Sequence, residues 1–368
     1  MELFFHISMI VTIMVVSLTG MGRTTRLFRS RGGPMAPSEP EFPTELEGED
    51  RFLVNPLNVD EVLSFGPRAP QGSSPGFPWD RSQLPQPQQS PIDICRCKCK
   101  SMTYQPLKLS YAKTSRNDGI VVEISNSGHG VNLKVPKAEA KPFLSGGMLS
   151  NRYIYDNIHC HWGRNDIMGS EHFIDAESYP MECHMVTFNE KYGTINEALK
   201  NKQDGVVVLT WFYKLANEDN KRLQNFLQYV PSVRENGAKI FRADQNALFF
   251  PLEVLPINQE YFAYPGSLTT PPFTEAVTFI ILPIAVGISK DQLALLRTLM
   301  DDKNPSKPVL SNRREIQTLN HRTVYCVKGR VQAISREIPP QQSNDVDYYD
   351  VYWDRGHQVT RNGRRYGR

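Results

Sequence analysis

Histidine is concentrated in one part of the chain, at spacings that suit a metal ion. Five of the eight histidines lie between residues 129 and 184. The segment "NIHCHWG" places His159 and His161 two residues apart, and "MECHMVTFN" contains His184. On a β-strand, residues i and i+2 face the same side, so His159 and His161 converge while Cys160 faces the opposite side. Three imidazoles from two adjacent strands match the ligand set of a catalytic zinc, which keeps its fourth position open.

A close histidine pair has two other interpretations. The pair can belong to an ordinary strand that binds nothing, or the histidines can form a redox pair with Cys160. We rank the redox pair last, because the alternation of a strand turns the thiol of Cys160 away from both imidazoles. The spacing of the histidines by itself leaves the other two interpretations open.

Short β-branched and aromatic segments predict the strands that would carry these histidines. Gly, Asn and Pro separate them, as is typical of turns. The segments are "GIVVEI", "VNLKV", "VVVLTWFY" and "AVTFIIL". Two helices are predicted, one beginning at Thr194 with Glu197 in a capping box, the other at Ser289 with Gln292. The apolar face of the second helix would consist of Leu293, Leu296 and Met300. These patterns predict a mainly β (α+β) domain with peripheral helices.

Composition divides the chain into four segments. Residues 1–22 contain an apolar run of signal-peptide length, so we expect a secreted, extracellular protein, with a signal anchor as the alternative. The run is too short and broken to favour a stable membrane span. Residues 23–74 are rich in Pro, Gly, Ser and Gln and predict a low-complexity segment. Residues 75–332 hold the predicted domain, and the polar residues 333–368 predict a disordered tail.

The charge and the cysteines limit the possible partners and the disulfides. The formal net charge of +3 gives no reason to expect a nucleic-acid partner. Six cysteines in 368 residues do not make a disulfide scaffold. Cys95, Cys97 and Cys99 alternate in "CRCKCK", so on a strand they would share one face. Free thiols or a local disulfide at a surface edge are favoured over a metal site there.

The histidine segments belong to a longer series of motifs that resembles the α-class carbonic anhydrases. The motifs are "QSPID", "SNSGHG", "HCHWGRNDIMGSEHFIDAESYPMECHMVTFN", "YPGSLTTPPFTE" and "NRREIQTLNHR", in that order. The resemblance runs from about Trp79 to Arg330 and is to an extracellular, secreted invertebrate-type member. It implies a single domain around a large twisted, mostly antiparallel sheet, with zinc at the base of a conical cleft. It also implies cis prolyl bonds at Ser90–Pro91 and Pro271–Pro272.

The resemblance implies the reversible hydration of carbon dioxide to bicarbonate and a proton by zinc-bound hydroxide, a chemistry for which carbonic anhydrase is the standard example. The zinc ligands would be His159, His161 and His184. Thr269 would accept a hydrogen bond from the hydroxide and donate one to Glu171. His129 would carry the released proton to solvent, since an imidazole titrates near neutral pH.

The same resemblance assigns the residues around the metal. Each zinc imidazole donates its other N–H to a fixed acceptor. These acceptors would be Asn157 for His159, the Asn312 backbone for His161 and Glu182 for His184. The carbon dioxide pocket would consist of Val186, Val208, Leu268, Thr269, Thr270, Val277 and Phe279. His172 matches a structural histidine that supports the region of Glu171 and has no catalytic role.

Three residues depart from the family pattern. Phe279 stands where the family usually has Trp, and Asn157 where it commonly has Gln. Phe273 replaces the cysteine with which many extracellular members form a disulfide. A bond between Cys160 and Cys183, on neighbouring strands, is one option for an oxidised protein and requires Cα atoms within about 7 Å.

The alternative function is that of a non-catalytic carbonic-anhydrase-related binding or extracellular matrix protein. Such relatives typically lack one or more zinc histidines, whereas this chain keeps all three together with Glu171, Thr269 and His129. Catalysis is therefore the favoured prediction, with carbon dioxide and bicarbonate as substrates. Contacts of the tails with extracellular matrix would be an additional role.

Overall fold

The computed structural model describes residues 76–112, 120–248, 251, 260–304, 306–329, 348–350, 352–354 and 357–359. The predicted signal peptide (1–22) and low-complexity segment (23–74) lie outside the described residues and stay predictions. Within the described residues, the structure has no helix that is long and apolar enough to cross a membrane.

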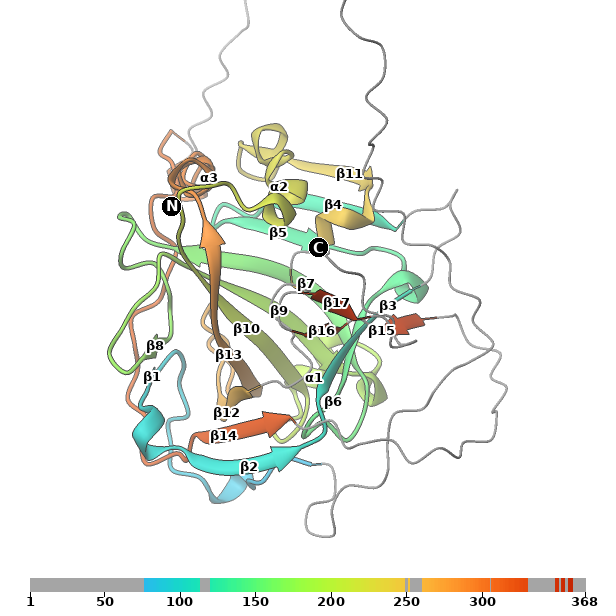
Figure 1. The fold of residues 1–368 in the computed structure, drawn as a ribbon, viewed down its shortest axis with the longest axis vertical. Helices are drawn as coiled ribbons and strands as arrows, with labels where there is room; N and C mark the ends of the chain where they lie inside the picture. Colours follow the sequence, from blue (N-terminus) through green and yellow to red (C-terminus); the bar gives the residue numbers. More distant parts are fainter. Residues whose placement is uncertain are drawn as a thin grey trace, which may run out of the picture. The chain divides into compact units, whose positions relative to one another are not determined.

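A large twisted sheet dominates the domain (Figure 1). Ten of its strands follow one another in the order β11 (Lys239–Ala243), β4 (Val121–Asn126), β5 (Val131–Lys134), β7 (Tyr153–Trp162), β9 (Met181–Asn189), β10 (Val206–Leu215), β13 (Val277–Ile288), β12 (Glu260–Gly266), β14 (Tyr325–Gly329) and β2 (Lys100–Tyr104). Three further strands join it beside this path: β3 (Leu107–Ala112), β6 (Phe143–Gly146) and β15 (Tyr348–Asp350).

Most strand pairs in this sheet are antiparallel, as predicted; β10 with β13 and β14 with β2 are parallel. The four predicted strand segments coincide with β4, β5, β10 and β13. Two pairs of short strands lie apart from the sheet: β1 (Asp93–Ile94) with β8 (Phe173–Ile174), and β16 (Tyr352–Asp354) with β17 (His357–Val359). Strands β15 to β17 lie within 333–368, where a disordered tail was predicted; the rest of that segment lies outside the described residues.

The two faces of the sheet bury two different apolar clusters. Along β10, Val207 and Leu209 belong to the larger cluster, whereas Val206 and Val208 belong to the smaller one. This alternation follows from the period of two in a strand. The smaller cluster, which also contains Val186 of β9, therefore lies on the face to which His184 points.

Short helices flank the sheet. They are α1 (Ile195–Leu199), α2 (Lys221–Leu227) and α3 (Lys290–Leu296), with 3-10 turns η1 (Arg81–Gln83), η2 (Arg96–Lys98), η3 (Ala138–Ala140), η4 (Glu190–Tyr192), η5 (Val230–Val233) and η6 (Gln245–Leu248). Thr194 and Ser289 cap α1 and α3 as predicted. Helix α3 ends before Met300, whose backbone instead bridges to Pro308, so the predicted length was wrong. Helix α2, which Asn220 caps, was not predicted.

All six cysteines form disulfides: Cys95–Cys97, Cys99–Cys326 and Cys160–Cys183. Cys160 and Cys183 lie directly opposite each other on β7 and β9, with Cα atoms 4.0 Å apart, as the predicted option requires.

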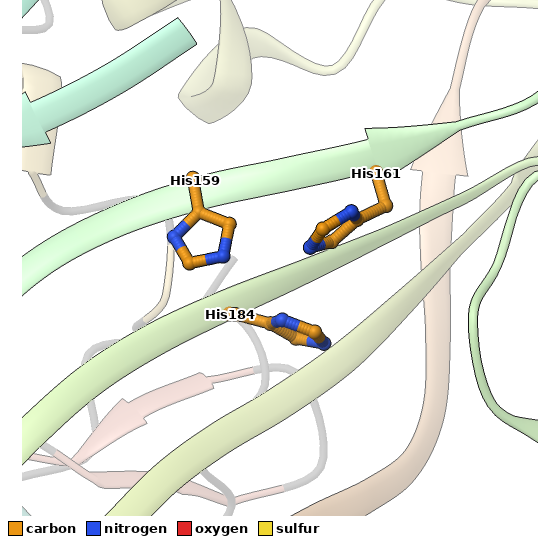
Figure 2. Close-up of side chains that lie close together, drawn as sticks. All are labelled: His159, His161 and His184. Atoms are coloured by element: carbon orange, nitrogen blue, oxygen red, sulfur yellow. The ribbon is translucent and has the colours of Figure 1, made fainter. Parts of the chain in front are cut away.

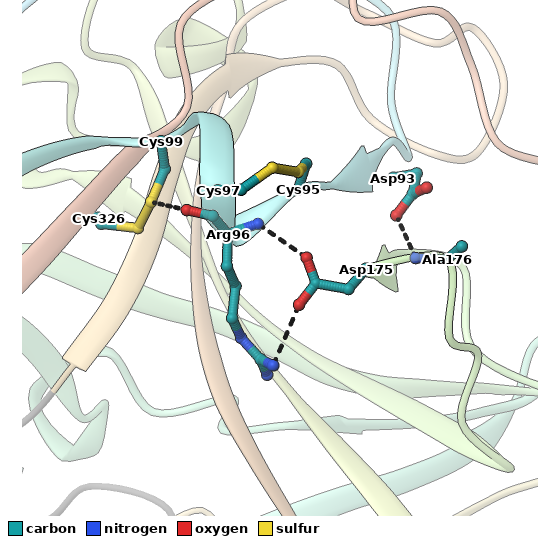
Figure 3. The surroundings of a disulfide bond; sticks show 8 residues. All are labelled: Asp93, Cys95, Arg96, Cys97, Cys99, Asp175, Ala176 and Cys326. Atoms are coloured by element: carbon teal, nitrogen blue, oxygen red, sulfur yellow. Dashed lines mark hydrogen bonds and ion pairs between the residues drawn. A yellow bond between two sulfur atoms is a disulfide. The ribbon is translucent and has the colours of Figure 1, made fainter.

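The segment "CRCKCK" does not form one strand. Residues 96–98 form η2, and this turn brings Cys95 and Cys97 together in a local disulfide. Cys99 forms its disulfide with Cys326 of β14 (Figure 3). Arg96 fixes this turn through its backbone N–H and its guanidinium, which bind Asp175 at 2.9 and 3.1 Å. The predicted cis peptide bonds at Ser90–Pro91 and Pro271–Pro272 are confirmed.

Candidate metal centre

His159, His161 and His184 meet on one face of the sheet (Figure 2). Strand β7 carries the first two and β9 the third, and His159 lies directly opposite His184 in the ladder. One ring nitrogen from each histidine lies within 4.8 Å of the others. The alternation of β7 turns Cys160 to the larger cluster on the opposite face, so the thiol does not belong to this group.

Each of the three imidazoles is held by one ring nitrogen. His159 Nδ1 lies 2.8 Å from Asn157 Oδ1, so the shorter side chain reaches the ring directly. His161 Nδ1 lies 3.1 Å from the Asn312 carbonyl oxygen. His184 Nε2 lies 2.6 Å from Glu182 Oε1. The three expected contacts are thus present in the structure, and each fixes both the tautomer and the direction of a ring.

Within the part of the chain that the structure describes, the second nitrogen of each ring makes no hydrogen bond. His161 Nε2 is buried and has no hydrogen-bond partner among the residues that the structure describes, which is costly unless a ligand binds it. Burial, together with the neighbouring imidazoles, holds the pKa of His159 well below its usual value of 6.5. Burial also lowers the pKa of His184, against the opposing effect of the hydrogen bond that His184 donates to Glu182. The low pKa values keep His159 and His184 neutral, and Zn²⁺ binds neutral imidazole through a free nitrogen, so the residues fit a zinc ion.

Glu182 connects the candidate metal ligands to the loop before β9. Its Oε1 accepts from His184 and from His172 Nδ1 at 2.7 Å, and its Oε2 accepts from the backbone N–H groups of Glu171 and His172 at 2.8 and 2.7 Å. Burial by itself would raise the pKa of Glu182, but the charge and hydrogen bonds of His172 and His184 hold it well below its usual value. The carboxylate is therefore ionised and acts as an acceptor only.

Thr269 and Glu171 are both described by the structure, and the predicted hydrogen bond from Thr269 to Glu171 is not present between them. Glu171 is 1% exposed, and its Oε1 accepts the backbone N–H of Arg314 at 2.8 Å. Its Oε2 is buried and has no hydrogen-bond partner in the described part of the chain. Thr269 is 9% exposed. The acceptor that the prediction needs is thus present and free.

His172 begins a buried chain of hydrogen bonds that the sequence did not indicate. Its Nε2 lies 2.6 Å from the hydroxyl of Tyr264, which lies 2.8 Å from Ser90 Oγ. The ring of Tyr264 stacks on Phe279 at 5.4 Å. Tyr264 and Ser90 lie inside the motifs "YPGSLTTPPFTE" and "QSPID", but nothing local in those motifs pairs them with His172.

The predicted carbon dioxide pocket maps largely onto the smaller apolar cluster. Val186, Val208, Val277 and Phe279 are buried members of it, and Leu268 packs against it. The ring of Phe279 lies 5.8 Å from that of His184. Thr270, in contrast, is exposed. The structure therefore places an apolar wall directly beside the candidate ligands.

His129 lies in the turn between β4 and β5, and its side chain is 60% exposed. It is not one of the residues that gather around the candidate metal position. Asn312 connects the two places, because its side-chain amide donates to the carbonyl groups of His129 and Cys160 at 2.8 and 2.9 Å. Asn312 also accepts from the backbone N–H of Trp162 at 2.7 Å. The sequence indicated only its carbonyl contact with His161.

Comparison with known proteins gives a consistent match to one family. The model of the eukaryotic-type carbonic anhydrase family matches residues 77–328. Carbonic anhydrase 1 of Oryctolagus cuniculus is 35% identical over 240 residues, which cover 64% of this chain and 97% of that protein. Carbonic anhydrase 1 of Mus musculus is 36% identical and carbonic anhydrase 3 of Homo sapiens 33%, each over 64% of this chain and 88% of the relative.

Proposed function

This chain belongs to the eukaryotic-type carbonic anhydrase family, whose members are zinc-dependent, and we propose that its His159, His161 and His184 hold the zinc ion of a carbon dioxide hydratase. As a carbonic anhydrase, the protein is an enzyme that acts on carbon dioxide and bicarbonate. The observation that carries the proposed site is the pattern of the ring nitrogens. One nitrogen of each imidazole is fixed by an acceptor, and the other makes no hydrogen bond to any described residue.

Zinc supplies an acidified water when it is bound, with a pKa near 7 for which carbonic anhydrase is the standard example. Glu182, Asn157 and the Asn312 carbonyl fix the directions of the three imidazoles, which determines where that water lies. Glu171 contributes an acceptor in its buried Oε2, which has no hydrogen-bond partner among the described residues. Thr269 contributes a hydroxyl that would accept a hydrogen bond from the attacking oxygen and, on turning to Glu171, donate one to that carboxylate, which orients the attack.

Carbon dioxide is apolar and needs a dry surface beside the metal. Val186, Val208, Val277 and Phe279 supply that surface, with Leu268 at its edge. We place the site at the base of a cleft that opens toward His129. His129 then accepts the proton that the hydration releases and passes it to solvent, for which its exposure suits it.

We also propose that the protein is secreted, as an extracellular member of the family. The pairing of all six cysteines supports an oxidising compartment, because disulfides are rare where thiols are kept reduced. An invertebrate-type origin, a cleaved signal peptide and contacts of the tails with extracellular matrix belong to the same proposal. Detection of the mature N-terminus in culture medium from secreting cells tests it.

Zinc binding by the three histidines is tested by titrating the metal-free protein with zinc in competition with a chelator. We expect one tightly bound ion, and His161→Ala should reduce the affinity by several orders of magnitude. His321→Ala is the matched control, since His321 is an exposed histidine in a turn outside the site. Equal zinc affinity in the two variants would refute the proposed ligand set. Full zinc binding with no hydration activity would favour the non-catalytic alternative.

A further inference from the structure

An acidic loop that has no part in the proposed function lies against His129. Asp302 follows α3 in the chain, and its Oδ2 lies 3.5 Å from His129 Nε2. The two side chains are 34% and 60% exposed. This distance is an ion-pair contact and is longer than an ordinary hydrogen bond. The loop thus places a carboxylate on the outer nitrogen of the proposed proton carrier.

Backbone contacts hold this carboxylate in place. The N–H of Asp302 donates to the carbonyl oxygen of Gly128 at 3.3 Å. Gly128 has a positive φ of 78°, and a Cβ atom there would lie 2.3 Å from Asp302 Cβ. Two residues earlier in each segment, the Asn126 side-chain amide donates to the Met300 carbonyl oxygen at 3.0 Å. The turn that carries His129 and the loop that carries Asp302 therefore form one fixed unit.

A carboxylate at Nε2 selects one form of the imidazole. Neutral His129 carries its proton on Nε2, where the negative charge of Asp302 stabilises it, and Nδ1 is left as the free acceptor. Nδ1 takes up the proton from the site and Nε2 then releases its proton to a base in solvent, which leaves a neutral ring with its proton on Nδ1. Exchange with water or buffer returns this proton to Nε2 before the next turnover. Asp301 adds negative charge without this contact, because its Oδ1 accepts the backbone N–H groups of Lys303 and Asn304.

We propose that Asp302 is a positioning residue for proton transfer by His129, a role that rests on the proposed function of His129. Its carboxylate sets the tautomer of the ring and stabilises the imidazolium that forms during each turnover. Both side chains are about a third or more exposed, so solvent screens the pair and its effect is moderate.

Kinetics separate this role from a structural one. Asp302→Ala keeps the Cβ atom that packs on Gly128 and removes the carboxylate. We expect kcat in dilute buffer to fall about two- to fivefold, the range of exposed ion pairs. The ratio kcat/KM should not change, because proton release follows the hydration step. Glu197→Ala, which removes an exposed carboxylate paired with Lys200 on α1, should leave both constants unchanged.

A double-mutant cycle shows whether Asp302 acts through His129. In the His129→Ala background, Asp302→Ala should have no further effect on kcat. An equal effect in both backgrounds, or an unchanged kcat in Asp302→Ala, would overturn the proposal. If instead His129→Ala itself leaves kcat unchanged, the proposed shuttle function fails.

The tautomer of His129 provides a test that does not depend on activity. Long-range ¹H–¹⁵N correlation spectra of the zinc-loaded protein above neutral pH should show the proton on Nε2. The Asp302→Ala variant should show a mixture of both tautomers. A ring with the same tautomer in both proteins would refute the proposal even if the protein were inactive.

Discussion

Replacing Glu182 by Gln should weaken zinc binding and destabilise the fold, because this carboxylate accepts four hydrogen bonds inside the domain. Two come from the imidazoles of His172 and His184, and two from the backbone N–H groups of Glu171 and His172. A glutamine presents only one oxygen, so one of the two pairs of donors would face an NH₂ group. Hydrogen bonds to a charged group contribute about 1.5–3 kcal/mol each, so the loss of two costs roughly 3–6 kcal/mol before relaxation.

Glu182→Gln should change the free energy of zinc binding less than the free energy of unfolding, because His184 keeps its ring and the nitrogen that would bind zinc. Removing a partner that orients a zinc ligand costs about 10- to 100-fold in metal affinity. Chelator competition measures this affinity, and denaturant unfolding of the metal-free protein measures the stability. Glu190→Gln is the matched control; that carboxylate pairs with Arg152 at the surface and should change the stability by less than about 0.5 kcal/mol. Wild-type zinc affinity and stability in Glu182→Gln would refute this account of Glu182.

Three further predictions concern the strands, the ionisation of the ligands and the attack on substrate. Replacing both Cys160 and Cys183 by Ala opens a loop with a sequence separation of 23 and should lower the free energy of unfolding by about 3 kcal/mol in denaturant titrations; no loss would mean that the bond does not form. The metal-free protein should lose stability as pH falls below about 6.5, by up to about 1.4 kcal/mol per pH unit for each imidazole. The reason is that the folded state lowers the pKa values of His159 and His184, so the unfolded chain binds protons first. A free energy of unfolding that stays constant between pH 6.5 and 5 in denaturant titrations would contradict this. Thr269→Val should reduce kcat/KM about 100-fold in stopped-flow assays at unchanged zinc affinity, as misplacement of a reacting group does; an unchanged kcat/KM would remove Thr269 from the mechanism.

The local part of the candidate metal centre could be predicted from the sequence. Alternation on a strand placed His159 and His161 on one face and turned Cys160 to the other, and the structure agrees. It also placed His184 and Glu182 together on the neighbouring strand. Such features depend on the period of two along a single strand, which the sequence shows directly.

Contacts between distant segments could not be predicted in the same way. Cys99 bonds Cys326 across a separation of 227 residues, and His172 reaches Tyr264 across 92. Both depend on how the strands are ordered in the sheet, and no local pattern specifies this order. The contact of Asp302 with His129 likewise requires the loop after α3 to meet the turn between β4 and β5. The predicted length of α3 was wrong for a local reason, because the apolar spacing continues to Met300 although the helix ends at Leu296.

The central claim is that hydration of carbon dioxide depends on zinc held by His159, His161 and His184. Stopped-flow hydration measured on the purified protein, after removal of its metal with a chelator and after return of zinc, tests it most directly. We predict activity in the zinc-loaded protein, loss of activity without metal and recovery with one equivalent of zinc. Activity that persists in the metal-free protein, or a fully zinc-loaded protein without activity, would contradict the account.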